Sequence, residues 1–274
     1  MKIGFIDYYL DEWHANNYPA WIREASGGQM EVALAYGMID SPIGGRTNEQ
    51  WCREMNIPRA LTIEEVVEQC DGVIVLSPDN CEMHEQLCQI PLRSGKPVYI
   101  DKTFAPDYET ARRIFDLAEA HSTPCYSTSA LRFADEYENP GPVDAIASWG
   151  PNGFETYAIH QLEPIMMLIQ SQPSRVLYVP GRDSYTMTIA FDDGRVATLT
   201  GFDAGSPFMM NVSSSGGSRI ITVESDFFHH FIEHLVAFFR DPTRIVPHGD
   251  TLRIMAVRGA GLKAMQTPGS CVEI

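Results

Sequence analysis

Short apolar runs alternate with amphipathic stretches through the first half of the chain. The runs are rich in Ile, Val, Leu and Phe and end at Gly, Pro or polar residues, as is typical of strands buried on both faces. They occupy residues 2–6, 30–36, 72–76, 98–100 and 124–128. The stretches between them read as helices, at residues 13–24, 62–70, 79–93 and 108–120. Strands that alternate with helices predict an α/β domain with a doubly wound parallel sheet over residues 1–130.

The pattern changes after residue 130, where short strand candidates follow one another. They occupy residues 176–180, 185–191, 195–201, 209–215 and 219–223. The tripeptide Asp192-Asp193-Gly194 separates two of them and is typical of a tight β-hairpin. Helices are expected beside these strands at residues 156–170, 227–240 and 251–265. The second domain, residues 131–274, is therefore predicted to be α+β with a largely antiparallel, open sheet.

A lysine follows one of the buried strands of the first domain. Residues 98–100 form the strand, and the polar pair Asp101 and Lys102 comes directly after it. Asp107 then precedes a helix, where its carboxylate can accept a hydrogen bond from a free backbone amide. Because ligands of open α/β sheets bind outside the carboxyl ends of the strands, Lys102 is a candidate catalytic residue.

Charge and composition exclude several classes of partner. The chain has 36 acidic and 20 basic residues and a formal net charge of −16, which repels phosphate backbones and anionic lipid surfaces. We therefore expect neither nucleic acid nor a membrane as partner. The six cysteines are scattered without a C-x-x-C pair, which favours reduced thiols and a cytoplasmic location.

Residues 71–130 resemble the Gfo/Idh/MocA oxidoreductases, a family named after glucose-fructose oxidoreductase, inositol dehydrogenase and a rhizopine-catabolism protein. The shared order is strand, Ser77-Pro78 turn, helix, Gly-Lys-x-Val strand, and Asp101-Lys102-Thr103 at the position of the family's Glu-Lys-Pro signature. Residues 153–168 are similar to the family's active-site helix, which places His160 at the position of its histidine. Residues 226–274 are similar to its closing helix pair and final strand.

This resemblance implies a Rossmann-like domain that binds NAD or NADP, followed by a domain for substrate binding and oligomerisation. It implies hydride transfer to or from a sugar, a polyol or a related carbohydrate. Lys102 is then expected to bind the substrate hydroxyl and the nicotinamide ribose, and His160 to act as general acid and base. Ser77, Pro78 and Asp101 are expected to join Lys102 at the cofactor. The sheet of the second domain is expected to form a homo-oligomer.

The turn after the first strand departs from the pattern of the family. It reads Asp7-Tyr8-Tyr9-Leu10-Asp11-Glu12 and has no glycine, although a glycine-rich turn normally lets backbone amides approach the pyrophosphate. The three carboxylates of this turn and the nearby His14 could bind a cation or substrate hydroxyls; a solvated loop is the alternative.

Other positions of the family pattern also differ. Thr156 stands one turn before His160, where the family has an aspartate, and Thr103 replaces the signature proline. The second strand lacks the usual acidic residue for the adenosine ribose, and Asp40 lies close to but not at that position.

Two functions therefore remain open. The first is an NAD(P)-dependent oxidoreductase acting on a carbohydrate with Lys102 and His160. The second is a cofactor-free relative, which would be a carbohydrate-binding or regulatory protein or a non-redox enzyme. Among the other histidines, we expect His84 to pack or cap, and the His230 and His234 pair to lie on a solvated or interface face rather than bind a metal.

Overall fold

The computed structural model describes all residues 1–274, and they form two compact units. The first unit consists of Met1–Thr128 and His229–His248, and the second of Ser129–Phe228 and Gly249–Ile274. The sequence predicts one boundary near residue 130, whereas the compact units change over at residue 128 and the chain returns to the first unit for residues 229–248.

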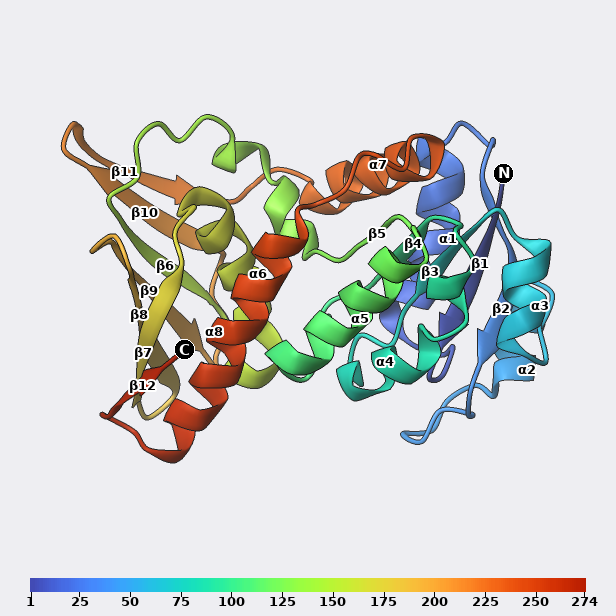
Figure 1. The fold of residues 1–274 in the computed structure, drawn as a ribbon, viewed down its shortest axis with the longest axis horizontal. Coiled ribbons are helices and arrows are strands. Elements are labelled where there is room, and N and C mark those ends of the chain that lie inside the picture. Colours follow the sequence, from blue (N-terminus) through green and yellow to red (C-terminus); the bar gives the residue numbers. More distant parts are fainter. The chain divides into compact units, whose positions relative to one another are not determined.

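The first unit is built on a five-stranded parallel sheet in the order β2-β1-β3-β4-β5 (Figure 1). Its strands are β1 (Lys2–Asp7), β2 (Glu31–Gly37), β3 (Gly72–Val75), β4 (Val98–Ile100) and β5 (Cys125–Tyr126). Beyond β2, a single parallel bridge joins Ala35 to Arg59. The chain passes from β1 to β2 on one side and then crosses to β3 on the other side of β1. The carboxyl ends of β1 and β3 therefore form the switch point where this fold binds ligands.

The helices of the first unit cover both faces of this sheet (Figure 1). They are α1 (Trp13–Ala25), α2 (Asn48–Met55), α3 (Ile63–Gln69), α4 (His84–Leu87), α5 (Tyr108–Ala120) and most of α7 (Phe227–Arg240). The predicted cap of α5 is confirmed, because the Asp107 carboxylate accepts a hydrogen bond from the Thr110 amide at 2.7 Å.

One sequence prediction about the helices is wrong, and one helix was not predicted at all. The single helix expected at residues 79–93 is replaced by a 3₁₀ turn at Cys81–Met83, the one-turn α4 and another 3₁₀ turn at Pro91–Arg93. Pro91 cannot donate the backbone hydrogen bond that a longer helix needs. Helix α2 was not predicted, although Thr47 and Gln50 form a complete capping box at its start.

Helix α7 packs its apolar stripe on the parallel sheet of the first unit, which corrects its expected place beside the strands of the second domain; the burial of the stripe itself agrees with its spacing. Phe231 contacts the rings of Tyr18 and Tyr99, with ring centroids 5.8 and 5.4 Å apart. Phe238 meets Tyr126 edge to face at 4.8 Å. Because each buried aromatic or aliphatic side chain contributes roughly 1.5–3 kcal/mol, α7 adds substantially to the stability of a unit that is distant from it in sequence.

The second unit is built on a seven-stranded sheet in the order β11-β10-β6-β9-β8-β7-β12. Its strands are β6 (Ala145–Pro151), β7 (Pro173–Pro180), β8 (Ser184–Phe191), β9 (Val196–Phe202), β10 (Met209–Ser214), β11 (Gly217–Thr222) and β12 (Cys271–Glu273). The prediction of a largely antiparallel sheet is confirmed, with β6 and β9 as its one parallel pair. Strand β6 was not predicted, because its sequence AIASWGP is poor in β-branched residues.

Helices α6 (Phe154–Leu168) and α8 (His248–Gln266) pack together on one face of this sheet. Gly261 of α8 makes the contact possible, because a Cβ there would lie 2.3 Å from the Phe154 ring. Along β8, buried residues alternate with half-buried ones, so the opposite face of the sheet is partly exposed. Two 3₁₀ turns, Ala130–Phe133 and Asp135–Tyr137, precede β6.

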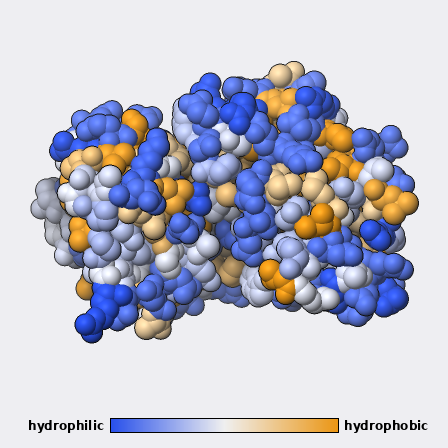
Figure 2. Space-filling model, turned by 90° about the horizontal axis from the view of Figure 1, so that it is seen from below, coloured by the Kyte–Doolittle hydropathy of each residue, from blue (hydrophilic) through white to orange (hydrophobic).

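The surface is mostly hydrophilic (Figure 2), as expected for a chain with 36 acidic and 20 basic residues. Figure 2 shows hydrophilic residues over most of the face in view, with apolar residues in small scattered groups. None of the helices is long and apolar enough to cross a membrane. All six cysteines are free thiols.

Candidate functional site

The amino terminus of α1 is capped by the carboxylate of Glu12. This side chain accepts hydrogen bonds from the backbone amides of His14, at 2.7 Å, and of Ala15. Only 8% of Glu12 is exposed. Burial raises the pKa of the Glu12 carboxyl to about 7, against the opposing effects of the His14 charge and of the two amides. The Glu12 carboxyl group therefore occupies the amides that a helix of this fold normally offers to a phosphate.

Asp7 adds a second buried carboxyl group at the end of β1. Its exposed fraction is 1%, and its Oδ2 atom has no hydrogen-bond partner. Burial raises the pKa of Asp7 well above its ordinary value, and the charge of Glu12 raises it further. Buried carboxyl groups that lack a cationic partner hold their protons more tightly, so this part of the site disfavours further negative charge.

His14 and Asp101 form a buried ion pair beside these carboxyl groups. The His14 Nδ1 atom lies in hydrogen-bond contact with the Asp101 carboxylate, which also accepts a hydrogen bond from the Tyr99 hydroxyl at 2.9 Å. The His14 ring stacks on Tyr18 at 5.0 Å. Burial alone would raise the pKa of Asp101, but its contacts with His14, Lys102 and the Tyr99 hydroxyl together lower it to about 2.

Asp11 is not part of this group, which corrects the cluster expected from the sequence. Its carboxylate binds the Arg46 guanidinium, with an Nε to Oδ1 distance of 2.9 Å, and the Arg46 amide at 2.8 Å. Asp7, Glu12 and His14 do lie together, joined by Asp101. No group of three or more His, Cys, Asp or Glu side chains in the structure has the arrangement of a metal site.

The loop before α1 is held by Asn48, a residue of α2. The buried side chain of Asn48 accepts a hydrogen bond from the Leu10 amide at 3.0 Å and donates to the carbonyl oxygens of Gly37 and Ile39. Asp40 accepts from the Asn48 amide at 2.7 Å, so it caps α2. None of residues 8–12 has a positive φ angle, so the loop does not adopt the conformation that glycines give a phosphate-binding turn.

Lys102 lies directly after β4, half-buried, next to the buried Asp101. Its ammonium group makes no hydrogen bond or ion pair within the chain. The peptide bond between Lys102 and Thr103 is cis. His84 fixes the backbone on both sides of this position, because its ring contacts the carbonyl oxygens of Leu76, after β3, and of Phe104. His84 therefore packs, as predicted.

Ser77 and Pro78 follow β3 at the same edge of the sheet. Ser77 has a φ of +73°, and its hydroxyl donates to the carbonyl oxygen of Asn80 at 3.0 Å. This contact forms a tight turn, so the Ser77 hydroxyl stabilises the turn rather than pointing freely into the switch point.

His160 lies in the second unit, on α6. Its Nδ1 atom contacts the Ser129 hydroxyl at 2.8 Å, and its ring lies against Tyr157 and Phe208, with centroids 5.2 and 5.9 Å away. The Ser129 amide donates to the Glu163 carboxylate at 3.1 Å. Ser129 thus contacts two side chains on successive turns of α6 and orients the His160 ring.

A buried ion network supports Ser129 and α6. The Arg132 guanidinium donates to Glu163 at 2.9 Å and to Asp250 at 2.7 Å. Arg253 donates to Asp250 at 2.7 Å and to three backbone carbonyl oxygens, those of Met166, Ile169 and Ser171. With every charge paired or hydrogen-bonded, the network can hold α6 in a defined position.

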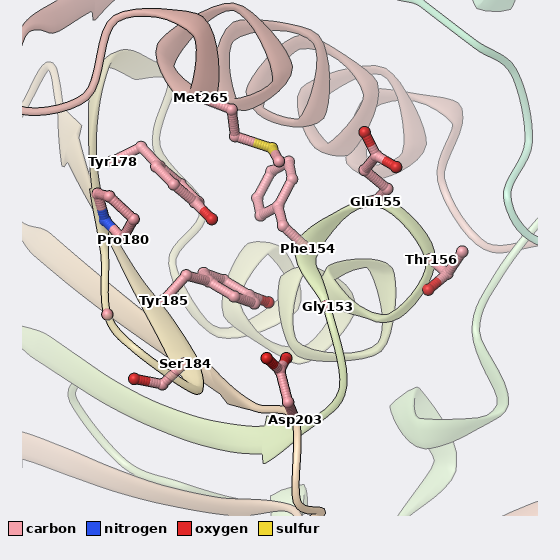
Figure 3. Close-up of a pocket in the computed structure, with 11 residues that line it drawn as sticks. Gly153, Phe154, Glu155, Thr156, Tyr178, Pro180, Ser184, Tyr185, Asp203 and Met265 are labelled. Atoms are coloured by element: carbon pink, nitrogen blue, oxygen red, sulfur yellow. The ribbon is translucent and has the colours of Figure 1, made fainter.

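A hollow of about 400 Å³ opens at the amino terminus of α6, wholly within the second unit (Figure 3). The stacked rings of Tyr178 and Tyr185, 5.6 Å apart, form one wall, and the carboxylates of Glu155 and Asp203 lie at its edge. Thr156 lines it and is one helical turn before His160. Aromatic rings beside carboxylates are groups that can bind the carbon faces and hydroxyls of a carbohydrate.

The first unit does not fit the pyrophosphate of a dinucleotide as it stands. The α1 amides are bonded to Glu12, a second carboxyl group is buried beside them, and the loop lacks a left-handed residue. A pyrophosphate would meet two carboxyl groups in place of free amides.

Sequence reasoning missed several residues of these sites. Ser129, Glu163 and Asn48 carry no motif, and only the fold brings them to their partners. The Thr47 to Gln50 capping box was the one local signal that could have placed α2, and with it Asn48.

A family model described as an oxidoreductase family with an NAD-binding Rossmann fold matches residues 41–128. No curated protein sequence matches the chain. Among solved structures, myo-inositol dehydrogenase from Lactobacillus casei, in complex with NAD(H) and myo-inositol, has a TM-score of 0.81 at 14% identity, covering 100% of this chain and 96% of that one.

Two other solved structures are similar to the same degree. A probable dehydrogenase from Thermotoga maritima has a TM-score of 0.80 at 12% identity, covering 100% of this chain and 98% of that one. GenD2 from gentamicin A biosynthesis, in complex with NAD, has a TM-score of 0.79 at 12% identity, with coverages of 100% and 96%. These TM-scores and coverages show a shared fold over the whole chain.

Proposed function

We propose that this protein is an oxidoreductase that acts on a hydroxyl group of a sugar, a polyol or a related carbohydrate. The proposal is supported by the Gfo/Idh/MocA oxidoreductase pattern in residues 41–128 and by the fold that the whole chain shares with an inositol dehydrogenase. The related structure from Lactobacillus casei contains NAD(H) and myo-inositol, which suggests the substrate class. A dinucleotide is the cofactor that the family implies. Because its pyrophosphate does not fit the α1 end as it stands, we assign roles only to the substrate hydroxyl and its proton.

Lys102 is the observation that carries this proposal. Lys102 follows a buried strand inside the matched segment and is half-buried, and its ammonium group has no hydrogen bond or ion pair with another group of the chain. The ion pair of Asp101 with His14 leaves the Lys102 ammonium available for a ligand. Lys102 donates a hydrogen bond to the substrate hydroxyl and stabilises the negative charge that develops on its oxygen.

His160 takes the hydroxyl proton in this proposal. A histidine titrates close to neutral pH, so His160 can exchange a proton with the substrate hydroxyl, and the contact of Nδ1 with the Ser129 hydroxyl orients its ring. In neutral imidazole one nitrogen donates and the other accepts, so a Ser129 hydroxyl that accepts from Nδ1 selects the tautomer in which Nε2 can accept.

The test combines turnover with folding. Purified protein is incubated with a panel of hexoses and inositols and with NAD or NADP, and reduced nicotinamide is followed by absorbance. We expect slow turnover of at least one compound, its loss in Lys102→Ala, and an unchanged melting temperature in that variant. No turnover of any compound, together with no heat of binding at millimolar NAD, NADP or their reduced forms, would contradict the proposal.

A cofactor-free relative that binds carbohydrate is the second candidate. The hollow beside Tyr178, Tyr185 and Asp203 favours it, because that hollow is complete within one unit and does not involve α1. This function predicts that sugars or polyols bind without nucleotide and that Tyr178→Ala and Asp203→Asn weaken the binding. Turnover that begins only when NAD is added to the pure protein would rule this candidate out.

A further inference from the structure

Dinucleotide-binding folds bind a pyrophosphate at the amino terminus of the helix that follows β1. In this protein the Glu12 side chain fills that position at the start of α1. We propose that the Glu12 carboxylate is a built-in occupant of the phosphate position, so that a dinucleotide can bind there only by displacing it. This inference rests on the proposed oxidoreductase function and adds a mechanism that controls access of the cofactor.

The geometry at Glu12 is that of a bound anion. One carboxylate spans two consecutive amides of the first turn, those of His14 and Ala15, which are the donors that a phosphate oxygen would otherwise receive. Glu12 is nine-tenths buried, so its carboxylate is not a mobile surface group.

A glutamate is also an unusual residue for this position. Helix caps are most often Ser, Thr, Asp or Asn, whose short side chains reach one amide and leave room beside the helix. Glutamate is longer, and here it places both carboxylate oxygens on the helix end. Stabilisation of the helix would not require this choice, since Asp107 caps α5 with a shorter side chain.

Two neighbouring features prevent an easy rearrangement. Asn48 holds the Leu10 amide and Arg46 holds the Asp11 carboxylate, so the backbone on the amino-terminal side of Glu12 is tied to the segment that enters α2. Asp7 has a buried carboxyl oxygen without a hydrogen-bond partner on the same side of the switch point. A phosphate that approached this position would encounter two carboxyl groups and gain no free amide from His14 or Ala15.

The experiment separates the negative charge from the helix cap. In Glu12→Ser the hydroxyl still caps α1, but the carboxylate is gone. The matched control is Asp107→Ser, which removes an acidic cap from α5. Both variants and the unmodified protein are titrated calorimetrically with NAD, NADP and inorganic pyrophosphate, and thermal melts verify folding. If Glu12→Ser does not fold, Glu12→Gly replaces it, because glycine is tolerated at a helix cap.

We expect Glu12→Ser to bind NAD or NADP, and pyrophosphate, at least about tenfold more tightly than the unmodified protein. A nearby like charge commonly changes the free energy of a buried anion by the equivalent of about one pKa unit, which is a factor of ten in affinity. Asp107→Ser should bind as the unmodified protein does. Equal affinity of Glu12→Ser and the unmodified protein for all three probes would overturn the inference.

The failure of this inference can be told from that of the proposed function. If the unmodified protein already binds NAD or NADP at micromolar concentration and Glu12→Ser changes nothing, Glu12 does not control access, while the oxidoreductase function stands. If neither protein binds any probe at millimolar concentration and no carbohydrate is turned over, both are wrong.

Discussion

At the scale of single residues, four ionisable side chains share the buried space at the end of β1. Burial raises the pKa values of Asp7 and Glu12, whereas at Asp101 the contacts with His14, Lys102 and the Tyr99 hydroxyl together outweigh burial and lower the pKa to about 2. Because these pKa shifts have opposite directions, the carboxyl groups have different roles. Asp101 holds a negative charge opposite His14, and Asp7 and Glu12 bind protons more tightly than they would in water.

Glu12 should make stability depend on pH. Its pKa rises from an ordinary 4.5 to about 7 on folding, so its protonated form favours the folded state. This contribution is fully present below pH 4.5 and is lost as pH rises through 7. Between these values we expect the free energy of unfolding to fall by up to about 3 kcal/mol relative to Glu12→Gln. Urea unfolding at a series of pH values measures it, and parallel profiles for both proteins would contradict the assignment.

Ser129 should tune His160 without touching substrate. In Ser129→Ala the Nδ1 contact is lost, and we expect turnover to fall by about tenfold and the pH dependence of turnover to shift, with KM nearly unchanged. Ser129→Thr keeps a hydroxyl and should restore the pH profile. A fall in turnover with an unchanged pH profile in Ser129→Ala would mean that Ser129 has a structural role only.

At the scale of elements, α2 decides the shape of the loop before α1. Asn48, in the first turn of α2, bonds the Leu10 amide and two carbonyl oxygens after β2. Gly37 allows this approach, since a Cβ at Gly37 would lie 2.3 Å from the Asn48 side-chain oxygen. The loop that replaces a glycine-rich turn is therefore stabilised by an element that follows β2.

Asn48→Ala should destabilise the first unit. The variant leaves the Leu10 amide and two carbonyl oxygens without partners, which costs about 2–3 kcal/mol of unfolding free energy. Gln50→Ala in the same helix removes only an exposed cap contact and should cost less than about 1 kcal/mol. Denaturant unfolding compares them, and equal losses would show that the buried contacts of Asn48 add nothing.

At the scale of the whole molecule, each unit has its own sheet and its own buried polar centre. The first unit places Lys102 and the Glu12 group at the carboxyl edge of the parallel sheet. The second places His160, Ser129 and the ion network on the helical face of the mixed sheet. The opposite face of that mixed sheet is half-exposed and carries the Thr186 and Thr200 hydroxyls, which bond each other at 2.9 Å.

Oligomerisation through this open sheet face remains our prediction. We expect the protein to sediment as a dimer or larger species, and Thr188→Glu, which places a charge on the half-exposed face of β8, to shift it toward the monomer. Gln86→Glu adds the same charge on the exposed surface of α4 and should leave the sedimentation coefficient unchanged. A monomer before any substitution would contradict the prediction.

The sequence by itself determined the elements whose signals are local. The apolar run of β4, the Asp107 cap of α5 and the stripe of α7 follow from spacing and from contacts within a few residues, so each was predicted close to its observed bounds. The missing glycines of residues 7–12 also indicated from the sequence that this turn is unlike a phosphate-binding loop.

Tertiary structure alone decided which polar groups meet. His14 and Asp101 are 87 positions apart, and Ser129 and His160 are 31 apart, and no local pattern pairs them. The order of β6 beside β9, and the separation of Asp11 from Asp7, likewise depend on packing between distant segments. Burial and hydrogen bonding act through space, and they turned a stretch of acidic residues into one capped helix end, one ion pair to Arg46 and one buried carboxyl group.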